Sequence, residues 1–318
     1  MRRDGPFALV LLAFAWLAGV AVPCLAGQTA DPTISVELQG EPAQPGGLLG
    51  LTVTTTRDVD EVTATAFGQT VTCVRDGSAR RWRGLLGIDL DVMKSSTLEV
   101  VARVDGHQRR AIYGAVRLQP RRFATRRLTV ASQFVDPSPT ELERIRQEAA
   151  LLDTLFHAVT VPERFPSFAP PLAGAVASNF GTRSVFNGEP RAPHAGADYR
   201  GAAGTPIEAP AAGRIVLAEP LFFTGNTVVI DHGLGLYSLL AHLSRIDAHV
   251  GDAVERGTVV GLLGATGRVT GPHLHWGVRI GAARVDPERL LAMLGPAHSG
   301  GQPTPGATKG LIPPTPVR

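Results

Sequence analysis

Two histidines one residue apart, His273 and His275, stand in the segment GRVTGPHLHWGVR among apolar and small residues. Successive side chains of a β-strand point to opposite faces, so residues two apart share one face. This spacing aims both imidazoles at one point, where a metal ion or a reacting group would bind. Core packing alone seldom places two imidazoles in this way, because they repel each other when both are charged.

Further candidate ligands lie in the same region. His194 and Asp198 are four residues apart in PHAGADYR, where Gly196 and the lack of helical periodicity favour a strand edge or turn. A catalytic zinc site uses three protein ligands, often mixed His and carboxylate, and keeps one position for water. His194, Asp198 and one member of the pair His273 and His275 supply that number, and the spacing leaves open which member binds.

The remaining histidine of the pair, together with His242 from LLAHLS, then lies beside the metal. Two uncoordinated imidazoles beside a zinc-activated water suit hydrolysis, because one can take a proton and one can stabilise charge on the attacked carbonyl oxygen. The region therefore predicts metal-assisted hydrolysis.

The segments PHAGAD, AHLS and TGPHLHW, in this order, resemble the signatures of the lysostaphin/LytM family of zinc metallopeptidases. Supporting matches are SNFGTR, GTPIEAPAAGRIV, GNTVVIDHG, GDAVERGTVVGLLGATG and VDPERLL, so the resemblance covers roughly residues 170 to 294. It implies a compact antiparallel β-sandwich of the lysostaphin/LytM type (duplicated hybrid motif) with a zinc groove. It also implies peptide crosslinks of bacterial peptidoglycan as the substrate.

The resemblance also assigns residues. It implies one Zn2+ per chain, held by His194, Asp198 and His275, with His242 and His273 as the catalytic pair. Arg183 and Asn187 match family positions near the cleft and are candidate substrate contacts. Many family members carry a tyrosine two residues before the histidine of AHL, and Leu240 stands there in this chain, with Tyr237 nearby but out of register. Trp276 alternates with the histidines and is expected in the core.

The elements around this region divide the chain. Short β-type runs separated by turn signals over residues 31–120 predict an Ig-like antiparallel sandwich, with a structural or docking role. Residues 121–170 form a linker, with an amphipathic helix begun by Ser138, Pro139 and Glu141 in a capping box and expected to pack between domains, followed by a proline-rich extended stretch. Residues 171–296 form the zinc peptidase domain, and residues 297–318 form a Gly- and Pro-rich tail expected to be disordered.

The N-terminus bears on location. Arg2, Arg3, an apolar run and small residues near Ala26 indicate a signal peptide over residues 1–26, and an uncleaved membrane anchor is the alternative. Beyond Cys24 the chain has Cys73 alone, which excludes an internal disulfide and a Cys-rich zinc site. The net charge of +3 without a basic block argues against nucleic acid binding. We therefore expect an exported protein, periplasmic or extracellular, without stable membrane insertion once the signal is cleaved.

The sequence predicts a secreted zinc endopeptidase for peptidoglycan crosslinks. Two alternatives stay open: a non-catalytic activator of another cell-wall hydrolase, and an extracellular protease for glycine-rich proteins. Latency through an N-terminal asparagine is excluded, because Asn179, Asn187 and Asn226 all lie in the peptidase region. Two other ways to keep the enzyme latent remain. The N-terminal domain or the linker could cover the groove, or the Cys73 thiolate could block the metal.

Overall fold

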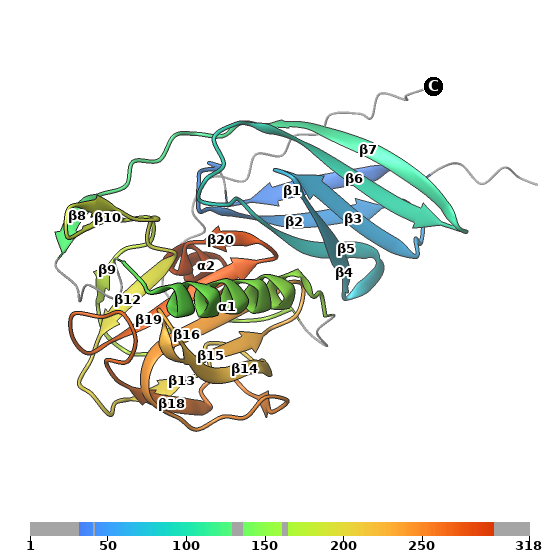
Figure 1. Cartoon of the computed structure of the whole chain (residues 1–318). Coiled ribbons are helices and arrows are strands. Elements are labelled where there is room, and N and C mark those ends of the chain that lie inside the picture. Colours follow the sequence, from blue (N-terminus) through green and yellow to red (C-terminus); the bar gives the residue numbers. More distant parts are fainter. Residues whose placement is uncertain (1–31, 41, 129–135, 161–164, 296–318) are drawn as a thin grey trace, which may run out of the picture. The chain divides into compact units, whose positions relative to one another are not determined.

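The computed structural model describes residues 32–40, 42–128, 136–160 and 165–295. The predicted signal peptide and the predicted disordered tail lie outside these residues. The described part of the chain is mainly β, with many strands and two helices, as the sequence predicts (Figure 1). In the described part, no helix has the length and apolar character that a membrane span requires.

The first seven strands form one antiparallel sheet in the order β1-β2-β5-β4-β3-β6-β7. Their bounds are β1 Ile34–Gln39, β2 Leu48–Thr55, β3 Glu61–Ala66, β4 Gln69–Asp76, β5 Ser78–Gly87, β6 Ser96–Val104 and β7 His107–Val116. The burial of β1 alternates strictly along the strand, since one face contacts the core and the other meets water.

This sheet folds into two layers, and strand β4 takes part in both of them. Its first half, up to Cys73, pairs with β3, and its last three residues, from Val74, pair with β5. Apolar residues of both layers, such as Val53 and Val100, are fully buried in one core. The sandwich expected from the sequence is therefore present, with a shared strand between its layers.

Helix α1 spans Pro139–His157 and has the predicted N-terminus. The Ser138 hydroxyl accepts a hydrogen bond from the backbone N–H of Glu141, and the Glu141 carboxylate accepts one from the backbone N–H of Ser138. Its buried residue Phe156 packs with Leu217 and Tyr237 of the second sheet. The helix thus covers a face of that sheet. The sequence predicted packing between two domains, whereas the buried residue of the helix packs on the second sheet.

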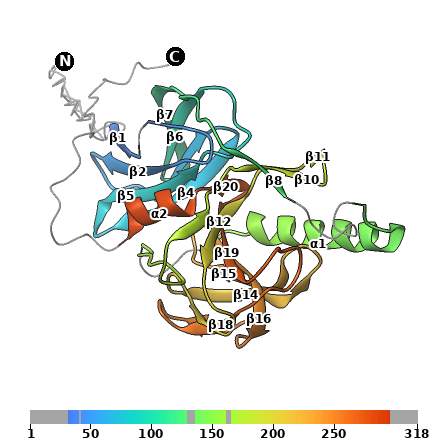
Figure 2. The same cartoon turned by 90° about the vertical axis from the view of Figure 1, so that its left-hand side faces the viewer.

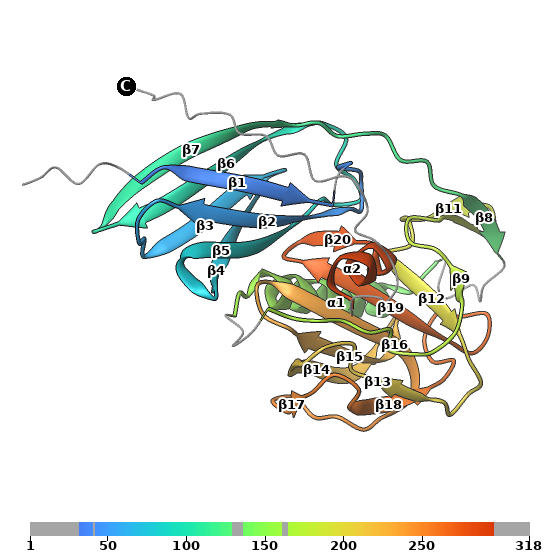
Figure 3. The same cartoon turned by 180° about the vertical axis from the view of Figure 1, so that it is seen from behind.

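The second sheet carries the predicted site. Its main path is β17-β14-β15-β16-β19-β12-β9, and every recorded pairing along it is antiparallel (Figures 1 and 3). The bounds are β9 Val176–Ser178, β12 Gly196–Arg200, β14 Gly213–Leu221, β15 Gly225–Asp231, β16 Leu236–Ile246, β17 Ala253–Val254 and β19 His273–Ile280. The long, largely buried strands β15, β16 and β19 lie in the middle of this sheet.

Shorter elements complete this region. Strands β13 (Pro206–Glu208) and β18 (Val259–Leu263) pair with each other, β18 also pairs with β16, and β20 (Ala283–Val285) pairs with β19. Helix α2, Pro287–Leu294, begins at Asp286, whose side chain accepts a hydrogen bond from the backbone N–H of Glu288. Their buried residues share one core with the main strands, including Ile207, Val260 and Leu290.

A separate three-stranded ladder of β8 (Thr125–Leu128), β10 (Arg183–Phe186) and β11 (Glu189–Pro190) lies beside this sheet (Figure 2). Strand β8 comes from the segment predicted as a linker, and it pairs with β10 in parallel, from Thr125 opposite Arg183 to Leu128 opposite Phe186. The segment between the helix and the second sheet is also packed, since Phe168 is fully buried and its backbone N–H donates to Leu294.

Candidate metal centre

The residues singled out from the sequence as metal ligands meet on two neighbouring strands. Asp198 of β12 lies directly opposite His275 of β19, and Ala241 of β16 flanks His275 on the other side. Opposite residues on antiparallel strands project their side chains from the same face. The strand pairing therefore brings together residues 77 positions apart in the chain.

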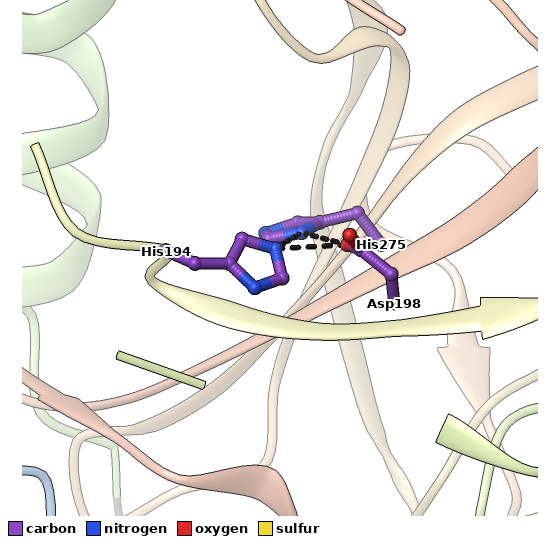
Figure 4. A group of neighbouring side chains, drawn as sticks. All are labelled: His194, Asp198 and His275. Atoms are coloured by element: carbon purple, nitrogen blue, oxygen red, sulfur yellow. Dashed lines mark hydrogen bonds and ion pairs between the residues drawn. The ribbon is translucent and has the colours of Figure 1, made fainter. Parts of the chain in front are cut away.

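His194 completes the cluster from the loop before β12 (Figure 4). Its Nε2 lies 2.9 Å from Nδ1 of His275 and 2.8 Å from Oδ1 of Asp198, while Nδ1 of His275 lies 3.0 Å from the same oxygen. One ligand atom from each of the three residues falls within 4.8 Å of the others. The side chains keep 10–14% of their surface exposed, so the cluster is nearly buried yet open to small molecules.

Two backbone features hold His194 and His275 in place. The Nδ1–H of His194 is 3.2 Å from the carbonyl oxygen of Asn179, which fixes the tautomer that leaves Nε2 for a metal. A Cβ added at Gly196 would lie 2.4 Å from the carbonyl oxygen of Trp276 and 2.7 Å from Cε1 of His275. Glycine between His194 and Asp198 thus permits the close approach of β12 and the His275 ring.

The electrostatics of the cluster favour an ionised aspartate. Burial would raise the pKa of Asp198, but its contacts with the His194 and His275 rings outweigh burial and hold this pKa well below its usual range. Burial lowers the pKa of His275, although the Asp198 carboxylate opposes that shift. A carboxylate and neutral imidazoles are the protonation states that bind a metal ion.

His242 and His273 lie beside this cluster. Their ring centroids are 4.9 Å apart, and the His242 ring is 5.9 Å from that of His275. Each ring has its Nδ1 next to a backbone carbonyl: Thr266 at 2.9 Å for His242, and Gly271 at 2.8 Å for His273. Because a carbonyl only accepts, Nδ1 carries a proton in both rings, which leaves Nε2 as the atom that can take part in proton transfer.

His242 also has an unusual backbone conformation. Its φ is +65°, a region that residues other than glycine rarely adopt, and its backbone N–H donates to Thr224. Burial, followed by the neighbouring His275 and His273 charges, lowers the pKa of His242 to about 3, so the ring is neutral near pH 7. Strained backbone at a site is often maintained for function, and nothing in the local sequence reveals it.

Other residues singled out from the sequence lie elsewhere. Arg183 and Asn187 are both exposed, on and directly after β10. Leu240 is fully buried in the core rather than facing the site. The Tyr237 hydroxyl donates to the carbonyl of Ala158, so this tyrosine anchors the end of α1.

Two further sequence-based interpretations can be compared with the structure. Trp276 is fully buried as expected, with its indole N–H donating to Ser238. Cys73 is buried in the core of the first sheet, and burial raises the pKa of its thiol to about 12. The hypothesis that its thiolate blocks the metal centre is wrong, because the thiol stays protonated and is enclosed in another core.

The donor set fits a divalent metal ion with nitrogen and oxygen preference. Two imidazole nitrogens and one carboxylate oxygen are the three-ligand pattern of catalytic zinc sites, which keep a further position for water. The two adjacent imidazoles supply groups that can transfer protons. An antiparallel β domain with this site defines a metal-dependent hydrolase.

Comparisons with known proteins agree with this class. Residues 192–287 match the model of Peptidase family M23. A solved protein from Pseudomonas aeruginosa, described as a peptidase M23, is 33% identical, with a TM-score of 0.61 over 79% of this chain and 95% of that one. The chain therefore belongs to peptidase family M23.

Curated relatives match over the same region. The chain is 42% identical over 102 residues to the peptidoglycan DD-endopeptidase ShyA of Vibrio cholerae, covering 32% of this chain and 24% of that protein. It is 44% identical over 94 residues to the DD-carboxypeptidase/endopeptidase Mpg of Neisseria meningitidis, covering 30% of this chain and 22% of that protein. The chain thus spans about a quarter of the length of these relatives.

Proposed function

We propose that this protein is an exported, zinc-dependent endopeptidase that hydrolyses peptide crosslinks of bacterial peptidoglycan. The observation that carries the proposal is the convergence of His194, Asp198 and His275, with one ligand atom of each within 4.8 Å of the others. The imidazole rings of His242 and His273 stand beside them. A non-catalytic regulator needs a surface that binds its partner and does not need metal ligands. The presence of all three ligand residues therefore favours an enzyme.

In this proposal His194 Nε2, Asp198 Oδ1 and His275 Nδ1 hold one Zn2+. Zinc bound there would lower the pKa of a coordinated water and polarise the scissile carbonyl. The Nε2 lone pair of His242 or His273 accepts the proton of the attacking water. Once protonated, the same ring donates a hydrogen bond to the developing charge and passes the proton to the leaving amine.

The substrate follows from the relatives. ShyA and Mpg are both named for DD-peptide bonds, which lie between two D-configured centres. We propose that this chain cleaves a bond of the same kind, and that it acts outside the cytoplasm, where peptidoglycan lies. Export would use residues 1–26 as a signal peptide, with an anchor as the alternative.

The test compares two histidine variants. His275→Ala should lose both bound zinc and cleavage, because a ligand is removed. His273→Ala should keep stoichiometric zinc and lose activity by about 100-fold or more, because only proton transfer is removed. Zinc is measured by mass spectrometry of the metal, and cleavage by release of peptide fragments from purified peptidoglycan. Stoichiometric zinc in His275→Ala would overturn the ligand assignment.

Chelation separates the alternatives. Cleavage that stops when zinc is removed and returns when zinc is added supports the enzyme. Purified protein that never cleaves, but increases cleavage by a second wall hydrolase, would support the activator. Faster cleavage of a glycine-rich protein than of peptidoglycan would support the general protease.

A further inference from the structure

Arg126 of strand β8 reaches the metal centre from a segment outside the matched family region, which begins at residue 192. β8 pairs in parallel with β10 (Figure 2), and in this pairing Arg126 stands opposite Ser184. The Nε–H of Arg126 donates to the buried hydroxyl of Ser184 at 3.3 Å, so one edge of the guanidinium is fixed.

The other edge of the guanidinium faces Asp198. Nη2 of Arg126 lies 3.8 Å from Oδ2 of Asp198, too far for a hydrogen bond but close enough for attraction between the charges. The two carboxylate oxygens of Asp198 therefore face different partners. Oδ1 faces His194 and His275, and Oδ2 faces Arg126. The Arg126 side chain remains 34% exposed, so its Nη groups are within reach of a ligand.

A cation at this place does not help to hold a metal. Arginine has no lone pair to offer, and its charge opposes the binding of a divalent ion at the neighbouring carboxylate. Its planar fork of N–H donors is suited to a carboxylate, which it can bind through two parallel hydrogen bonds. Arg126 is therefore suited to bind an anionic group of the substrate.

We propose that Arg126 determines substrate specificity by binding a free carboxylate on the residue that supplies the amine of the scissile bond. The inference rests on the proposed function and deepens it. The D-configured centre on the amine side carries its carboxyl group on the carbon next to the amide nitrogen. Consecutive residues are about 3.8 Å apart along a chain, so a substrate whose scissile carbonyl lies at the ligand cluster has that carboxylate close enough for a guanidinium beside Asp198 to bind it.

Two synthetic peptides test the inference with the full chain. Both contain a D-alanyl–D-amino acid bond, and the residue after the bond ends in a free carboxylate in one peptide and in a carboxamide in the other. The wild-type protein should cleave the carboxylate peptide with a kcat/KM about 10- to 100-fold higher, as expected for a charge-assisted bidentate contact. Arg126→Met should remove this preference by lowering kcat/KM for the carboxylate peptide alone.

Three controls make the outcome decisive. Arg127→Met removes the adjacent exposed arginine of β8 and should leave the preference unchanged. Arg126→Lys should keep part of it, because the charge remains without the fork. Zinc content should match the wild-type value in all three variants.

The results separate this inference from the proposed function. If the wild-type protein cleaves both peptides equally, or if Arg126→Met slows both by the same factor, Arg126 only positions Asp198 and the specificity role is refuted. Loss of zinc in Arg126→Met also refutes it. Failure of the wild-type protein to cleave either peptide or peptidoglycan would refute the proposed function itself.

Discussion

His232 makes the stability of the protein depend on pH in a way that can be measured. This side chain is buried, with Nδ1 at 2.9 Å from the carbonyl of Ala212 and Nε2 at 2.9 Å from the hydroxyl of Ser238. The Ser238 oxygen in turn accepts the indole N–H of Trp276. The imidazole of His232 is therefore a member of a buried polar network next to β19.

The network needs neutral His232. Burial lowers its pKa from 6.5 to about 4, although the carbonyl of Ala212 acts in the opposite direction. Between these two values the unfolded chain binds a proton that the folded protein does not, so stability falls as the pH decreases through this window. From pH 7 to about pH 4.5, the two pKa values give a loss of about 2 kcal/mol in the free energy of unfolding.

The test variant is His232→Gln. The glutamine side chain offers a hydrogen-bond donor and an acceptor, but it does not titrate. Urea unfolding is measured near pH 7 and near pH 4.5, with a chelator present so that metal release does not contribute. The wild-type protein should lose about 2 kcal/mol more than the variant between the two pH values. His249→Gln, at a histidine with 86% of its side chain exposed, is the matched control and should behave as the wild type.

The comparison concerns the change with pH, so a lower stability of His232→Gln at neutral pH does not affect it. Protonation of His242 and His275 occurs in both proteins and cancels. If the wild-type protein and His232→Gln lose the same free energy, the buried imidazole is not a source of acid sensitivity.

Two more predictions follow from burial. Leu240→Tyr should lower the free energy of unfolding by about 1–3 kcal/mol through overpacking, because Leu240 is fully buried. Urea unfolding beside the volume-conserving Leu240→Met tests this, and a fully stable Tyr variant with higher activity would contradict it. The Cys73 thiol, with its pKa raised to about 12 by burial, should react with a thiol reagent at a significant rate only after denaturant is added, and rapid labelling of the native protein would show that the core opens.

Local patterns predicted much of this protein. The alternation of His273 and His275 indicated a strand with both rings on one face, and both lie in β19. The Ser138 and Glu141 capping box predicted the start of α1, and it is formed. These features depend on neighbours within a few residues, so the sequence alone contains them.

Other elements were missed because their signals are weak. Strand β5, SARRWRGLLG, has three arginines in its first six residues and lacks a regular apolar alternation, although Trp82 and the residues after Arg83 are buried. Strand β8 was assigned to a linker, since TRRL has no apolar alternation. Strand β5 is held by pairing with the more distant β2 as well as with the neighbouring β4, and β8 is held by pairing with the distant β10.

The sequence by itself determined which side chains could do chemistry: two imidazoles aimed together by a two-residue spacing, and a His and Asp four apart. The tertiary structure alone decided that Asp198 stands opposite His275, that a positive φ orients His242, and that Arg126 reaches Oδ2 of Asp198. Side-chain direction follows from local backbone geometry, which a short pattern specifies. Strand register and long-range contact depend on the burial of the whole core, and no local segment contains that information.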